Sequence, residues 1–139
     1  MSKSKKSGNK NGMNWITQVK RLAIYMRDGL ACAYCGQSIE AGASLCLDHL
    51  VSRCDGGSNH ASNLVTACKR CNDSKNSRSV AKFADAVAAY VNHGLTAGGI
   101  VEHVRDCVKR TLPIDEARDL IALRGSAAKV LAAHRADQE

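Results

Sequence analysis

The chain has 139 residues, of which 45% are hydrophobic, and a formal net charge of +7. This length fits one domain, or a small domain with an appendage, and the hydrophobic fraction predicts that most of the chain folds. No apolar stretch approaches the roughly 20 residues that cross a bilayer, and the lysine-rich N-terminus lacks the apolar region of a secretory signal. We therefore expect a cytoplasmic protein with no membrane partner.

The positive charge belongs to the first half of the chain. Residues 1–78 hold 12 Lys and Arg against 5 Asp and Glu, whereas residues 79–139 hold 8 of each kind. A one-sided basic half is typical of proteins that bind a polyanion such as nucleic acid. A basic segment can also serve solubility alone, so the charge by itself leaves both interpretations open.

The first elements predict an α+β unit. Residues 1–13 hold almost no apolar surface, so we expect a disordered basic tail. Apolar residues at helical spacing predict a helix from about 15 to 28. Residues 44–53 alternate loosely and predict a strand that turns into a second strand, and residues 65–78 predict a short helix. A hairpin followed by a helix is a ββα unit.

Beyond residue 78 the sequence predicts only helices. Apolar stripes run from Val80 to Val91 and from Ile100 to Leu112, Pro113 fits the start of a third helix, and a last helix is expected near 127–136. We therefore divide the chain into the tail 1–13, a motif-bearing domain 14–78 and a helical extension 79–139. The extension carries no recognisable chemistry, and it could cover the domain, form a homodimer or bind a protein partner.

Two CxxC pairs, Cys32–Cys35 and Cys68–Cys71, are the strongest motif in the chain. In a cytoplasmic protein this spacing favours a metal over disulfides. Four thiolates close a tetrahedral shell and leave no position for water, so the predicted ion is a structural zinc that stabilises a unit with a small core. Unrelated reduced thiols are the alternative. The spacer of 32 residues between the pairs is longer than the usual spacer of about 15–20, and it leaves room for an inserted segment.

Four residues in or beside this spacer form a candidate catalytic set: Asp48, His49, Asn63 and Asn72. Hydrolysis of a phosphodiester needs a base that activates water and a divalent ion that neutralises charge. The neutral imidazole of a histidine is well populated near neutral pH, and the side-chain oxygens of Asp48 and Asn72 suit Mg²⁺ or Mn²⁺. Adjacent strand residues point to opposite faces, so a bulge or a strand end at Asp48–His49 is required if both are to reach one ion.

Taken singly, each of these residues has a plainer interpretation, since a lone histidine is often structural and an asparagine often caps a helix or turn. In combination they resemble the HNH endonuclease family, specifically its zinc-stapled branch, which includes McrA-type proteins and proteins of phages or mobile elements. The similar stretch runs from about Arg21 to Arg78. Besides the cysteine pairs it includes Leu47-Asp48-His49-Leu50-Val51, Gly56-Gly57, Asn63-Leu64-Val65 and Asn72.

The resemblance implies a ββα-metal fold with a single catalytic divalent ion. It makes His49 the water-activating base, Asp48 the acidic metal ligand, Asn63 the residue that pins the loop and orients the base, and Asn72 the second metal ligand. Asn72 stands where the family usually has its final histidine, so this is an H-N-N variant. The harder oxygen ligand favours Mg²⁺ or Mn²⁺ over Zn²⁺ or Ni²⁺.

The expected function is therefore that of a metal-dependent DNA endonuclease whose substrate is double-stranded DNA. Five basic side chains near the motif are candidates for phosphate contacts, with a solvated surface as the alternative: Arg53, Lys69, Arg70, Lys75 and Arg78. The alternatives from other classes are a non-catalytic four-cysteine zinc module that binds DNA, and a phage packaging or assembly accessory that recruits a partner through residues 79–139.

Overall fold

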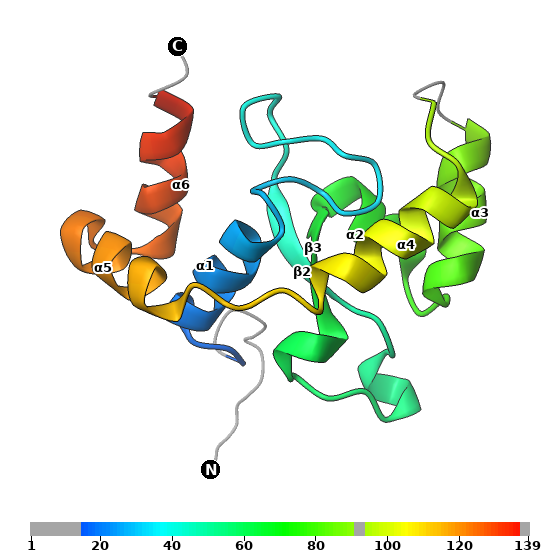
Figure 1. Ribbon diagram of the computed structural model, residues 1–139, viewed down its shortest axis with the longest axis horizontal. Coiled ribbons are helices and arrows are strands. Elements are labelled where there is room, and N and C mark those ends of the chain that lie inside the picture. The colour runs from blue at the N-terminus through cyan, green and yellow to red at the C-terminus, as the bar shows by residue number, and fades with distance from the viewer. Residues whose placement is uncertain (1–14, 91–93, 137–139) are drawn as a thin grey trace.

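A computed structural model describes residues 15–90 and 94–136 (Figure 1). The predicted tail 1–13 lies outside these residues. The helices and strands are α1 (Gln18–Arg27), β2 (Leu45–His49), β3 (Leu64–Cys68), α2 (Lys69–Lys75), α3 (Val80–Tyr90), α4 (Ala97–Cys107), α5 (Ile114–Arg124) and α6 (Ala127–Ala136), with short 3₁₀ turns η3 (Arg53–Asp55) and η4 (Ala61–Asn63). Helices accompany a small antiparallel sheet, so the predicted α+β class is confirmed.

The centre of the fold is a ββα unit. β2 and β3 pair antiparallel with regular register from Leu45 opposite Cys68 to His49 opposite Leu64, and α2 follows β3 without a loop. The expected position of the second strand within residues 44–53 was wrong. The second strand is β3, all five residues of which are buried, because an apolar run with β-branched residues pairs well in a sheet core. The helix expected from residue 65 begins only at Lys69, where the sulfur of Cys68 accepts from the Cys71 amide as its N-cap.

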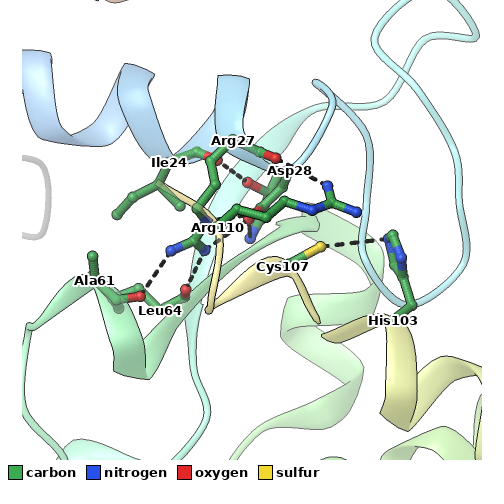
Figure 2. A network of polar contacts seen from close by, with 9 residues as sticks. Ile24, Arg27, Asp28, Ala61, Leu64, His103, Cys107 and Arg110 are labelled. Atoms are coloured by element: carbon green, nitrogen blue, oxygen red, sulfur yellow. Dashed lines mark hydrogen bonds and ion pairs between the residues drawn. The ribbon is translucent and has the colours of Figure 1, made fainter. Parts of the chain in front are cut away.

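A buried ion pair ties α1 to the strands (Figure 2). The Arg27 guanidinium donates through Nε to Asp28 Oδ1 at 2.7 Å, and the two side chains are 1% and 0% exposed. Arg27 also donates to the carbonyl oxygens of Ala61 and Leu64, at 3.0 and 2.7 Å. Asp28 Oδ2 accepts from the Thr66 amide of β3 at 2.8 Å. The end of α1 therefore fixes both η4 and the start of β3.

The helices after residue 78 flank the central unit on both sides (Figure 1). α3 and α4 bury Phe83 and Val104 in one cluster with Tyr34 and Val65. α5 and α6 pack against α1 in a second cluster, and the described residues contain no helix long and apolar enough to cross a membrane. At the end of α6, Arg135 donates to the carbonyl oxygens of Ile39 and Ala43. The helices thus share cores with the ββα unit, and the division at residue 78 stays a prediction.

Candidate active site

The four cysteines of the CxxC pairs meet at the junction of β3 and α2. Their sulfurs lie within 4.8 Å of one another, and the sulfurs of Cys35 and Cys68 are 3.8 Å apart. A tetrahedral zinc with Zn–S bonds of about 2.3 Å places its sulfurs about 3.8 Å apart. Gly36 closes the first turn with a φ of +82°, and its amide donates to the Cys32 carbonyl. The donor set and its spacing therefore fit the predicted zinc ion.

The four thiols compete for protons in a small space. A hydrogen bond from Cys32 holds the pKa of Cys35 well below its ordinary value. The same contact raises the pKa of Cys32 to about 12, and a hydrogen bond with Cys32 raises the pKa of Cys71. The thiolate charges of Cys35 and its neighbours raise the pKa of the adjacent Arg70 guanidinium. A cluster that shares its protons in this way is suited to a cation that replaces them.

Asp48 is buried on the face of β2 that packs against α2. It is 3% exposed, and its Oδ2 accepts from the Tyr34 hydroxyl at 2.5 Å and lies 3.3 Å from Lys75 Nζ. Burial raises the pKa of the Asp48 carboxyl, while the Tyr34 hydrogen bond and the Lys75 charge oppose this rise. Among residues 15–90 and 94–136, no hydrogen-bond donor reaches Oδ1. A buried carboxylate oxygen that accepts no hydrogen bond is available to coordinate a cation.

His49 is the last residue of β2, and its ring lies on the opposite face of the strand. β2 ends there without a bulge, with Asp48 opposite Val65 and His49 opposite Leu64. The imidazole packs against the Trp15 ring, with centroids 5.1 Å apart and planes inclined by 34°. Its Nε2 is 2.8 Å from the Asn59 side-chain oxygen. The strand end that the sequence required is present, although the two side chains leave the strand in opposite directions.

Asn63 holds the loop that connects His49 to β3. Its Oδ1 accepts from the Val51 amide at 2.9 Å, and its Nδ2 donates to the carbonyl oxygens of Val51 and Ser58 at 3.1 and 2.8 Å. The chain passes so close at Gly57 that a Cβ there would lie 1.7 Å from the Val51 oxygen. These contacts are those of a residue that pins the loop, and the catalytic role of Asn63 stays a prediction.

Asn72 lies half-buried at the middle of α2. Its side chain contacts the thiol of Cys46, whose pKa burial raises to about 11. Cys46 and Asp48 are two residues apart on β2 and share one face, so Asn72 and Asp48 lie on the same side of the sheet. The two predicted metal ligands are therefore on one face, and the predicted base is on the other.

The basic side chains differ in exposure. Arg53, Lys69, Arg70 and Arg78 are exposed, and Lys69 pairs with Asp73 on the helix surface at 2.8 Å. Lys75 is 0% exposed, which is not compatible with the expected phosphate contact. Its ammonium instead compensates the buried Asp48 charge and donates to the His49 carbonyl oxygen at 3.2 Å. Lys75 thus holds two consecutive residues of the candidate site.

Sequence reasoning assigned no site role to Tyr34, Asn59 or Lys20. Tyr34 lies inside the first CxxC pair, where only the cysteines carried a signal. Asn59 lies in the loop after η3, and Lys20 lies on α1, where its Nζ donates to the Asn59 main-chain carbonyl oxygen at 2.7 Å. The contacts of Tyr34 with Asp48, of Asn59 with His49 and of Lys20 with Asn59 join residues at least ten positions apart, so no local pattern could have indicated them.

Comparison with known proteins assigns this arrangement to a family. Residues 32–87 match the family model for HNH endonucleases. The chain is also similar to a CRISPR-associated endonuclease Cas9 from Actinomyces naeslundii, with 34% identity over 144 residues that cover 100% of this chain and 12% of that protein. No solved structure matches the chain with comparable significance. The segment 32–87 includes all four clustered cysteines together with the candidate catalytic residues, so the match to the HNH endonuclease family falls on the part of the chain that holds the candidate site.

Proposed function

We propose that the chain is a metal-dependent DNA endonuclease that uses one divalent ion and His49 as a general base. One observation carries this proposal: within the HNH segment, β2 ends at His49, and the preceding Asp48 carboxylate is buried with an oxygen that no donor among residues 15–90 and 94–136 reaches. A purely DNA-binding zinc module has no need of such a carboxylate. The similarity to a protein named as an endonuclease supports the same reading.

In the proposed reaction the His49 imidazole accepts a proton from a water molecule, and the water oxygen forms a bond to phosphorus. The bond between phosphorus and the 3′ oxygen breaks, and this oxygen leaves with the electron pair. A divalent Mg²⁺ or Mn²⁺ ion on Asp48 and Asn72 would supply neutralisation of the charge that develops on the phosphate and on the leaving oxygen. Lys75 keeps the Asp48 carboxylate and the His49 main chain in register through its two contacts.

The proposed substrate is double-stranded DNA, bound mainly through its phosphates. Arg53 lies in the loop next to His49, and three further exposed basic residues lie on or just after α2: Lys69, Arg70 and Arg78. Contacts of this kind do not depend on base sequence, and they weaken as salt rises because they release condensed counterions. Arg78 is partly engaged already, since its guanidinium donates to the Ser74 carbonyl and lies 5.3 Å over the Phe83 ring.

The test is a plasmid nicking assay with the zinc-loaded full chain in Mg²⁺ or Mn²⁺, and with EDTA as a blank. Loss of a general base lowers a rate by roughly 10²–10⁴-fold, so we expect at least a 100-fold loss in His49→Ala. His103→Ala, on the exposed surface of α4, is the matched control and should cut at the wild-type rate. Equal cleavage by His49→Ala and wild type contradicts the assignment. DNA binding that survives EDTA, with no nicking in any divalent ion, supports the zinc-module alternative instead.

A further inference from the structure

Asn59, in the loop between η3 and η4, receives two hydrogen bonds on one side-chain oxygen. Its Oδ1 is 2.8 Å from His49 Nε2 and 3.0 Å from Arg53 Nη1. The residue is half-buried, and its carbonyl oxygen accepts from Lys20 Nζ at 2.7 Å. Three segments, namely α1, the end of β2 and η3, therefore hold this single loop residue beside the His49 ring.

The arginine decides which atom of the Asn59 side chain faces the histidine. A guanidinium has only donors. If the Asn59 amide were turned the other way, its NH₂ group would face the N–H groups of Arg53, and neither could accept a hydrogen bond. The atom that Arg53 and His49 share must therefore be the acceptor oxygen. His49 Nε2 must then be the donor and carry a hydrogen. In a neutral imidazole only one nitrogen is protonated, so the lone pair that can accept a proton lies on Nδ1.

We propose that Asn59 is a positioning residue that fixes His49 in the Nε2–H tautomer, so that Nδ1 is the basic atom. This inference rests on the proposed role of His49 as the base. The Trp15 ring against one side of the imidazole limits its remaining rotation. Without the Asn59 oxygen, part of the population carries the hydrogen on Nδ1 and cannot accept a proton there. Asn63 has a different role, because its hydrogen bonds go to the loop backbone and not to the His49 ring.

The direct test is the tautomer of His49 in long-range ¹H–¹⁵N NMR spectra of the zinc-loaded full chain at about pH 8, where an ordinary histidine is neutral. We expect the Nε2–H form alone in the wild type and in Asn59→Asp, which keeps an acceptor oxygen. Asn59→Ala should give a mixture of both tautomers. Ser62→Ala, an exposed neighbour in η4 whose side chain makes no hydrogen bond to the described residues, is the matched control and should match the wild type.

The nicking assay gives the second measurement. We expect kcat to fall by about 10–100-fold in Asn59→Ala, the usual effect of removing an outer partner that orients a histidine, with DNA affinity unchanged. Asn59→Asp should recover most of this loss, which a role in folding alone would not explain. A single Nε2–H tautomer in Asn59→Ala overturns the proposal even if the rate falls. A wild type that shows the Nε2–H form but cuts no DNA refutes the proposed nuclease function while the contact between Asn59 and His49 stands.

Discussion

Substitution of Arg27 by methionine tests whether the buried network of Figure 2 holds the fold together. Methionine keeps much of the apolar volume but removes the guanidinium. The Asp28 carboxylate, 0% exposed, then loses the guanidinium and keeps the Thr66 amide and the Cys107 thiol as neighbours, and the carbonyl oxygens of Ala61 and Leu64 lose the hydrogen bonds from Arg27. Removing one partner of a buried ion pair costs about 3–5 kcal/mol. For a chain of this size that loss lowers Tm by about 10–20 °C.

The assay is urea denaturation of the zinc-loaded full chain, followed by far-ultraviolet circular dichroism. The matched control is Arg118→Met on α5, which breaks an ion pair with Asp115 at 2.9 Å whose side chains are 60% and 96% exposed. An exposed pair of this kind contributes about 0–1 kcal/mol. If Arg27→Met loses less than about 1 kcal/mol of unfolding free energy, the network does not carry the stability that its burial implies.

Two further predictions concern the metal cluster and the loop. Cys71→Ser should lose the single zinc ion that we expect per chain, as measured by elemental analysis. It should also unfold, because zinc binding in small domains supplies folding free energy. A folded variant that keeps stoichiometric zinc contradicts the structural site. Gly57→Ala should lower nicking at least tenfold, because its Cβ would lie 1.7 Å from the Val51 oxygen and force the loop to move. Gly98→Ala in α4, where a Cβ meets nothing within 4 Å, should cut normally, and equal activity of the two variants would show that the loop tolerates the shift.

The sequence predicted the parts of the site that follow from short motifs. The clustering of the four cysteines follows from the CxxC spacing, and the helices after residue 78 follow from apolar periodicity and turn residues. The second strand was misplaced, because a short apolar run such as Leu64–Cys68 has no periodicity that separates a buried strand from a buried helix. Lys75 was expected on the surface, because its partner Asp48 lies in a different element and only the tertiary fold brings them together.

The side-chain contacts of the candidate site could not be predicted from the sequence, for a related reason. The hydrogen bond between His49 and Asn59 joins residues ten positions apart, and the loop between them takes its shape from Asn63 and from the close approach at Gly57. Such a loop has no repeating pattern, so its side-chain contacts emerge only once its ends are fixed by the strands.

The two ends of α2 connect chemistry that is otherwise separate. At seven residues the helix is too short to be stable alone, and it is held by Cys68 and Cys71 at its start and by the Lys75 contacts with Asp48 and His49 at its end. A chemical event at the sulfurs, such as oxidation or capture by a softer metal, would free the first turn and withdraw the Lys75 ammonium from the strand. Blocking the cluster sulfurs is therefore expected to disturb Asp48 and His49 of the candidate site through Lys75, without modifying either side chain.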